Sequence, residues 1–452
     1  MTRRADPVRL ALAGDVILNR KVSDTKDESI QAILSVLQSA DLSFGNCETL
    51  FHDYVGPEVY PAVEAGWSYM RSPPNMAAEM RAIGFGLMGT ANNHMLDYSY
   101  GGMFSTHAAL DAAGIAHGGS GRDLGAARCP AYANAGNLRV GVVSMATSVA
   151  PWARAGMPHE GIPGRPGVNP LRVHFRADAA AMQRIVELNT GLGNWVARIG
   201  EREWQVNPPG LHHSVTRYIL SDTPGLGMVL DEHDVAGNLR TITSAKAQAD
   251  IVIAHIHNHE WDQDRGTAYP ADFMVEFARQ AIEAGADIVF AQGSHAPLRG
   301  IELYKGKPVF YDTGDLFSTS NTVTRFPRDF YTRHDREIHK PYEDVLPIDG
   351  IKARALYHLP MTTNPPGGYQ QGRGRAGIVP VLTYEGTTLA RVELHPFLHR
   401  HDTIGERGLP YRPDEAGAAK VLADLQTLSD PFGSASIRIE GGIGLLDLAA
   451  SA

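Results

Sequence analysis

The chain has 452 residues, of which 43% are hydrophobic and 20% charged, and its formal net charge is −9. This length exceeds the roughly 100–200 residues of a typical domain, so it fits one large elaborated domain or two domains. The acidic balance argues against a general nucleic-acid-binding protein, which carries a basic surface. Two cysteines, Cys47 and Cys129, exclude a disulfide framework and a zinc site built on paired cysteines.

The sequence contains no stretch that suits a membrane span or a signal peptide. Its apolar runs fall well short of the roughly 18–20 residues that cross a bilayer. The first run, residues 8–13, is interrupted at once by Gly14-Asp15, so we interpret it as a strand. We therefore expect a soluble, cytoplasmic protein.

The first half of the chain alternates predicted strands with predicted helices. Apolar residues recur at helical spacing in residues 29–40, which predicts a helix there. A second helix is predicted to end before Gly114, a good C-terminal stop. The predicted elements are strands at 8–13, 42–44, 85–88 and 138–145 and helices at 29–40 and 102–113.

The second half repeats this alternation and then changes to hairpins. The predicted elements are helices at 239–249 and 271–284, strands at 251–253 and 287–291, and hairpins turning at Lys305-Gly306 and Glu385-Gly386. We interpret the long segments at about 174–234 and 318–377 as insertions and about 398–452 as a C-terminal extension, all within one domain spanning 1–452. Alternating strands and helices followed by hairpins predict an α/β layered sandwich.

The stretch "ADIVIAHIHNHEW" places His255, His257 and His259 at every second position. Side chains two apart in a strand point the same way, so a strand continuing through His259 would present all three imidazoles on one face. One interpretation is structural, with one histidine capping the strand, one solvated and one in the core. The other is a metal, an anion or a proton relay at the carboxyl edge of the sheet, where open α/β sheets place their sites.

Polar residues follow five of the predicted strands, and strand ends on one edge of a sheet converge in space. These residues are Asp15, Asn46 with Glu48, Asn92-Asn93-His94 with Asp97, the three histidines, and His295. Carboxylate, amide oxygen and imidazole ligands together suit a borderline divalent metal such as Zn, Mn or Fe. Because a carboxylate can bridge two cations, we expect one or two ions. Taken singly, Asp15 could cap a helix, Glu48 could be solvated and "ANNH" could be a turn.

These motifs, in this order, resemble the bacterial capsule-synthesis protein CapA family, which is associated with poly-γ-glutamate. The matching text includes "LALAGDVIL", "ADLSFGNCET", "GLMGTANNHMLDYSYGG", "ADIVIAHIHNHEW" and "GSHAPLRGIELYKGKPVFYDTGDLF". The resemblance covers residues 8 to about 173 and 240 to 318. It implies the calcineurin-like metallophosphoesterase fold, a layered αββα sandwich.

By this resemblance, five residues are metal ligands and two are catalytic. The implied ligands are Asp15, Glu48 (in the place of the bridging carboxylate), Asn93, His257 and His295. His94 would lie beside the reacting oxygen and protonate the leaving group or stabilise developing charge. Glu260 matches the glutamate that follows the family's strand-end histidine.

The chain also departs from the family pattern. "HNHEW" is one residue shorter between histidine and glutamate, and "GSHAP" keeps one histidine where the family has three. The first motif, Asp15-Val16-Ile17, lacks the histidine of the broader metallophosphoesterase pattern. Since these changes remove ligands, His255 and His259 are further candidate ligands.

The predicted insertion at 318–377 is basic within an acidic chain. Arginine forms forked bonds with carboxylate and phosphate, so we predict that this segment is a lid that binds an anionic substrate. The predicted substrate-binding residues are Arg325, Arg328, Arg333 and Arg336. A solvated loop or a contact in a homo-oligomer is the alternative.

Two functions follow from these patterns. The first is a metal-dependent hydrolase in which metal-activated water attacks a phosphoester or a γ-glutamyl amide of an anionic small molecule or polymer. The second is a non-enzymatic polyanion-binding component of poly-γ-glutamate metabolism. The fold alone does not decide between these two functions. Turnover that is lost in the presence of a chelator would indicate the hydrolase.

Overall fold

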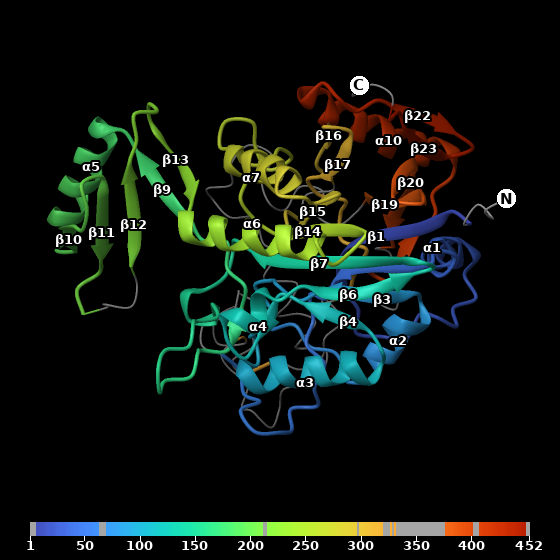
Figure 1. Ribbon diagram of the computed structural model, residues 1–452, viewed down its shortest axis with the longest axis horizontal. Helices are drawn as coiled ribbons and strands as arrows, with labels where there is room; N and C mark the ends of the chain where they lie inside the picture. The colour runs from blue at the N-terminus through green and yellow to red at the C-terminus, as the bar shows by residue number, and fades with distance from the viewer. Residues whose placement is uncertain are drawn as a thin grey trace, which may run out of the picture.

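Two large sheets pack face to face, with helices on both outer sides (Figure 1). The structure is a computed structural model that describes residues 6–62, 69–210, 215–295, 298–319, 326–327, 330, 376–400 and 406–448. No helix among these described residues is long and apolar enough to cross a membrane.

The first sheet has the strand order β22-β23-β20-β19-β1-β2-β3-β4. Its strands are β1 (Val8–Ile17), β2 (Leu42–Asn46), β3 (Phe85–Gly89), β4 (Ala116–Gly118), β19 (Ala376–Glu385), β20 (Thr388–His399), β22 (Ile437–Glu440) and β23 (Ile443–Leu446). Strands β1 to β4 are parallel, and β19 joins β1 antiparallel. Its outer helices are α1 (Glu28–Gln38), α2 (Met76–Ala82) and α3 (Ser99–Ala112).

The second sheet has the order β16-β17-β15-β14-β7-β6. Its strands are β6 (Ala131–Ala135), β7 (Leu138–Ala146), β14 (Ile251–His257), β15 (Ile288–Gln292), β16 (Ile301–Tyr304) and β17 (Lys307–Phe310). Its outer face is covered by α6 (Glu232–Lys246) and α7 (Asp272–Glu283). Helix α10 (Glu415–Ser429) contacts β16 and β20, so it packs against both sheets. Shorter elements are β5 (Ser120–Gly121), α4 (Leu124–Arg128), β8 (Gly167–Val168), β18 (Phe317–Ser318) and β21 (Pro410–Tyr411).

Alternating side chains divide the core into three apolar layers. Leu10 of β1 and Ile251 of β14 belong to the layer between the sheets. Ala11 of β1 packs outward with α1 and α2, and Val252 of β14 packs outward with α6 and α7. This is the predicted αββα sandwich, because the central strands of both sheets bury both of their faces.

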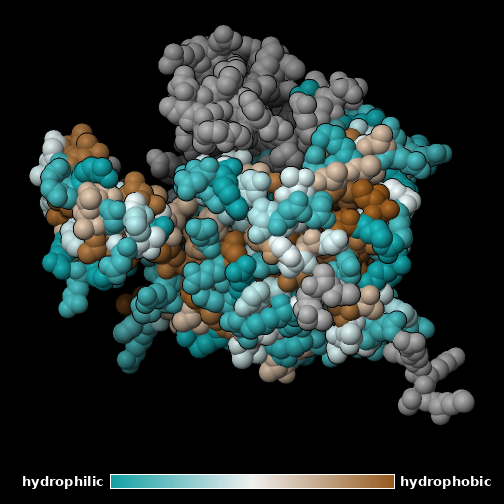
Figure 2. Space-filling model, turned by 90° about the horizontal axis from the view of Figure 1, so that it is seen from above, coloured by the Kyte–Doolittle hydropathy of each residue, from teal (hydrophilic) through white to brown (hydrophobic). Residues whose placement is uncertain are grey.

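Residues 173–230 form a separate five-stranded sheet at the left of Figure 1. Its order is β10-β11-β12-β9-β13, and its elements are β9 (Val173–Ala177), α5 (Ala179–Gly191), β10 (Trp195–Arg198), β11 (Glu203–Asn207), β12 (Thr216–Leu220) and β13 (Leu226–Leu230). The chain enters and leaves through neighbouring antiparallel strands, with Val173 opposite Leu230. At this base Arg172 bonds both Asp231 and Asp234. Seen from above, the unit shows hydrophobic surface (Figure 2), and its exposed residues include Leu188, Leu192 and Trp195.

Most predicted elements are present, with shifted ends. Strand β1 runs to Ile17 rather than stopping before Gly14, and α6 begins at Glu232 rather than near residue 239. Lys305 and Gly306 both have positive φ, as a two-residue hairpin turn requires. The second hairpin turns one residue later than predicted, because Glu385 pairs with Thr388. Helix α2 and the strands of the inserted sheet were not predicted, and most of 318–377 lies outside the described residues.

Candidate metal centre

The inward-facing row of each central strand changes from apolar to polar at the carboxyl end. In β14 the row that starts with Ile251 and Ile253 continues with His255 and His257. In β2 the inward Phe44 is followed by Asn46. Since these strands are parallel within their sheets, their polar ends meet at one edge of the inter-sheet layer.

Asp15 faces inward because the β1 strand has an irregularity at Gly14. Ala13 and Val16 both belong to the outer core, so the alternation of faces is broken between them. The register of β1 against β2 shifts at the same place. A Cβ on Gly14 would lie 2.0 Å from the carbonyl oxygen of Gly314, so only glycine allows this close approach. The carboxylate of Asp15 is thereby turned into the interior, where the residue is 1% exposed.

Asn46 connects two of the predicted ligands. Its Nδ2 donates to Asp15 Oδ1 at 2.7 Å and lies 3.1 Å from His257 Nδ1. The other ring nitrogen of His257, Nε2, lies 2.9 Å from Asn93 Oδ1 and 3.7 Å from Glu48 Oε1. Four of the five predicted ligands are therefore within one short network, and Asn46 is a site residue that the sequence indicated only as part of a polar strand end.

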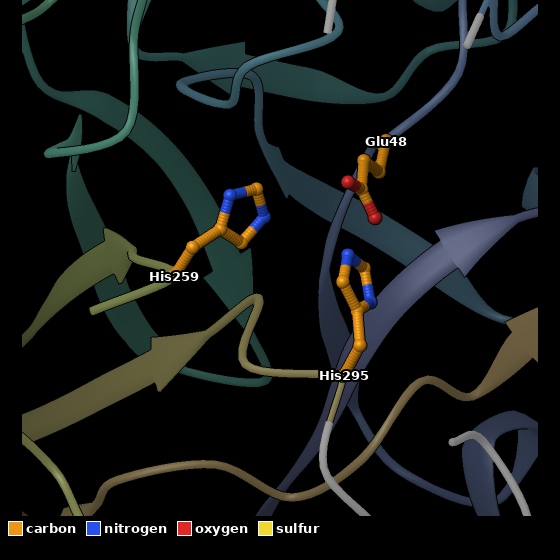
Figure 3. A group of neighbouring side chains, drawn as sticks. All are labelled: Glu48, His259 and His295. Carbon is orange, nitrogen blue, oxygen red and sulfur yellow. The ribbon is translucent and has the colours of Figure 1, made fainter. Parts of the chain in front are cut away.

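Among the described residues, three groups of side chains could each hold a cation, with the ligand atoms of each group within 4.8 Å of one another. The Asp315 group is Asp15, His295 and Asp315; the His257 group is Asp15, Glu48 and His257; the His259 group is Glu48, His259 and His295. Figure 3 shows the His259 group, whose side chains point toward one another from three separate segments. A carboxylate can bridge cations, so Asp15 or Glu48 could serve two groups at once, whereas one neutral imidazole nitrogen serves one ion.

The donor atoms fit a divalent metal. Asp15 Oδ2 and His259 Nε2 are buried and make no hydrogen bond within the described parts of the chain. Burial tends to raise the pKa of Asp15, but the hydrogen bond and charge of His257 hold it well below its usual range. Burial lowers the pKa of His259 well below its usual value, and the charge of His257 adds to this. Ionised carboxylate and neutral imidazole are the forms that bind metal.

Asp315 was missed by sequence reasoning as a candidate ligand. Its Oδ1 lies 3.2 Å from His295 Nδ1, and the residue is 3% exposed. It stands in "DTGD", which follows β17 as the other polar runs follow their strands, so the same pattern could have found it. His295 itself has a φ of 49°, an uncommon backbone conformation for a residue with a side chain.

His94 lies at the edge of this cluster. Its Nδ1 lies 2.7 Å from Asp97 Oδ2, which also accepts a hydrogen bond from the backbone nitrogen of Met70. Its Nε2 is directed to the cluster, 3.8 Å from Glu48 Oε1. Asp97 therefore fixes the ring orientation, with Nε2 facing the cluster.

His255 and Glu260 have other surroundings. His255 Nδ1 lies 2.8 Å from Ser144 Oγ, its ring meets Phe44 edge-on, and burial lowers its pKa to about 3. It belongs to none of the three groups. The Glu260 carboxylate accepts hydrogen bonds from the hydroxyls of Thr147 and Ser148. These contacts hold the Glu260 carboxylate beside the backbone of His259, and its catalytic role stays a prediction.

The predicted substrate-binding arginines lie outside the described residues: Arg325, Arg328, Arg333 and Arg336. Two described residues of the same segment, Phe326 and Phe330, stack on each other with ring centroids 4.1 Å apart. Phe330 belongs to the same buried apolar cluster as Tyr98, which directly follows Asp97.

An αββα sandwich with carboxylates and imidazoles buried at its strand ends is a metallophosphatase-like fold. The model of one family, described as bacterial capsule synthesis protein PGA_cap, matches residues 9–320. The chain belongs to this family.

Relatives extend the similarity beyond the matched region. The protein described as "uncharacterized protein y4sH" of Sinorhizobium fredii is 32% identical over 453 residues, which cover 99% of this chain and 94% of that protein. A "probable polyglutamine synthesis accessory protein" of Mycobacterium tuberculosis is 30% identical over 55% of this chain and 49% of its own. The "PGA biosynthesis protein CapA" of Bacillus subtilis is 38% identical over 19% of this chain and 21% of its own.

Proposed function

We propose that the protein is a metal-dependent hydrolase that cleaves a phosphoester or a γ-glutamyl amide in an anionic substrate. The observation that carries this proposal is the convergence of three ligand groups on shared carboxylates, with Asp15 Oδ2 and His259 Nε2 buried and lacking hydrogen bonds among the described residues. Leaving such buried polar atoms without hydrogen bonds costs roughly 1–3 kcal/mol each, so a cation that they bind would offset the cost.

The metal ligands of the proposed centre are Asp15, Glu48, Asn93, His257 and His295, with His259 and Asp315 completing it. A divalent cation bound there supplies Lewis-acid activation of water and of the bond to be cleaved.

The chain's own residues supply the proton transfer and the geometry. His94, held at Nδ1 by Asp97, presents Nε2 toward the cluster and can donate a proton to the leaving group. Asn46 holds Asp15 and His257 in a fixed relation. Asp15, Asn46 and His257 lie on fully buried strand ends, so these three side chains sit on rigid elements.

The names of two relatives point to glutamyl polymers, as a polyglutamine synthesis accessory protein and a PGA biosynthesis protein. We extend this to a substrate with γ-glutamyl groups. The predicted arginines of the 318–377 segment would bind its carboxylates. Added salt should then raise KM, since screening weakens partly exposed charge pairs.

Metal content and turnover test the proposal together. The protein is stripped with chelator, reloaded separately with Mn²⁺, Zn²⁺ or Fe²⁺, and assayed for bound metal and for hydrolysis of phosphoesters and γ-glutamyl amides. We expect one or two bound ions and turnover that is lost on stripping and restored on reloading.

The Asp15→Asn variant should lose both metal and turnover. Its charge-matched control is Asp424→Asn, because Asp424 is exposed on α10 and bonded only to Lys420 in the described structure. Binding of a γ-glutamyl polymer that is equal with and without metal, and without any turnover, would instead establish the polyanion-binding function.

A further inference from the structure

His259 reaches the candidate metal centre although no strand places it there. Strand β14 ends at His257, so the two-residue alternation that directs His255 and His257 inward no longer acts on His259. His259 nevertheless belongs to a ligand group with Glu48 and His295. Other contacts must therefore fix the backbone on either side of it.

Arg299 makes three such contacts, in addition to the bond from the backbone nitrogen of His259 to Ser148 Oγ. Its Nη1 donates to the side-chain oxygen of Asn258 at 3.1 Å, and its Nη2 donates to the backbone oxygen of Glu260 at 2.9 Å. Asn258 and Glu260 are the two immediate neighbours of His259. A third bond, from Nε to the backbone oxygen of Thr267 at 3.1 Å, ties the far end of the same loop to the guanidinium. The planar guanidinium thus holds the loop at three points, which are the residue before His259, the residue after it and Thr267.

Arg299 is itself rigidly placed. It is 1% exposed and is among the largest fully buried side chains of the described structure. Its backbone nitrogen donates to the backbone oxygen of Asp312, and the Asp312 carboxylate accepts from the backbone nitrogen of Ser294, next to His295. Burial lowers the pKa of Arg299 to about 10, opposed by the charges of Asp312 and Glu260, so the guanidinium stays charged at neutral pH.

We propose that Arg299 is a positioning residue that holds His259 against Glu48 and His295. The forked guanidinium suits this task because its donors lie in one plane and reach two acceptors at fixed spacing, which a lysine ammonium cannot reproduce. The positioning role itself does not depend on the proposed metal-dependent function. Only one consequence rests on that function, namely that loss of Arg299 weakens binding of a cation by His259.

The test measures the accessibility of His259 in metal-free protein. Histidines are modified with diethylpyrocarbonate, and the modified positions are assigned by fragmentation of the peptide that contains His255, His257 and His259. In the Arg299→Gln variant we expect His259 to react about tenfold faster than in the parent protein, because hydrogen bonds to both of its neighbours are lost. His255, buried in the core, should keep its low reactivity.

Arg279→Gln is the matched control. Arg279 lies on α7 and bonds Glu302, away from the loop of His259, so its variant should leave His259 unchanged. If Arg299→Gln does not fold, as judged by circular dichroism, Arg299→Lys carries the test and should show a smaller increase. Unchanged reactivity of His259 in a folded Arg299 variant would overturn the proposal, as would an equal increase at His255, which indicates general loosening.

Metal binding separates this proposal from the proposed function. Arg299→Gln should lose the same share of bound Mn²⁺ or Zn²⁺ as His259→Ala, and the double variant should lose no more, because both changes remove one position. Additive losses would count against the positioning role. A parent protein that binds no metal would overturn the proposed function, while the labelling would still decide the role of Arg299.

Discussion

The pair Gly89 and His255 offers a direct test of the assignment of His255 to the core rather than to the metal centre. A Cβ on Gly89 would lie 2.5 Å from His255 Nδ1 and 2.7 Å from Cε1, which is far inside ordinary contact. Gly89 has no positive φ, so a Gly89→Ala change does not strain the backbone. Its effect on the folded state is the steric overlap of the new methyl group with the His255 ring. We expect it to destabilise the protein by about 1–3 kcal/mol, the usual cost of overpacking.

His255→Ala removes opposing contributions. It leaves a cavity beside Phe44 and takes away the partner of Ser144, which together cost about 3–5 kcal/mol. It also removes a buried Nε2 that has no hydrogen bond among the described residues, which stabilises the folded state by about 1–3 kcal/mol. The net expectation is a loss of about 2 kcal/mol. In the double variant the new alanine methyl at position 89 enters the cavity, so the two costs should fall short of their sum by about 1–2 kcal/mol.

The assay is urea unfolding of metal-free parent, single and double variants, combined with metal analysis of each folded protein. Bound metal should be the same in all four, because His255 belongs to none of the ligand groups. Additivity within about 0.5 kcal/mol would refute the packing argument. Loss of metal from folded His255→Ala would refute the assignment of His255 to the core.

Three further predictions concern the site and the surrounding fold. His94→Gln should lower kcat by about 10²–10⁴-fold with bound metal unchanged, which metal analysis beside steady-state kinetics will check; a parallel loss of metal would contradict its role in proton transfer. Asp315→Ala should weaken or abolish binding of one ion while spectroscopy of bound Co²⁺ still reports a site with His257, and retention of full stoichiometry and affinity would exclude Asp315 as a ligand. Burial, reinforced by the charge of His117, lowers the pKa of His107 from 6.5 to about 3. Between these values the unfolded chain binds a proton that the folded chain does not, so stability falls by up to about 1.4 kcal/mol per pH unit as pH decreases. His107→Gln should reduce that slope in acid unfolding experiments, and an unchanged slope would show that His107 is protonated in the folded state.

The sandwich and most of its central strands could be predicted because the chain shows its periodicity directly. Strand β14 reads as an apolar run, and its two-residue period places His255 and His257 on the inner face, as the structure shows. The inserted sheet could not be predicted in the same way. Its strands are four or five residues long and only partly buried, so they lack the alternation that marks a strand packed on a large core.

The candidate site shows the same division. Polar residues at the end of a buried strand or a few residues beyond it, such as Asn46 and Asp315, carry a pattern that the sequence displays. The inward turn of Asp15 depends on a close approach of Gly14 to Gly314, and the position of His259 depends on bonds made by a residue forty positions away along the chain. Long-range packing of this kind leaves no local period, so sequence reasoning could name these residues but could not place them.

The five-stranded insertion has a consequence for how such proteins vary in length. Val173 and Leu230 face each other across antiparallel strands, so the point where the chain departs from the main body and the point where it returns are adjacent. A gene that lost everything between them could close the gap with a short turn, without redirecting β7 or β14. The unit is thus an appendage that evolution can enlarge, shrink or exchange, while the strands that carry the ligands keep their course.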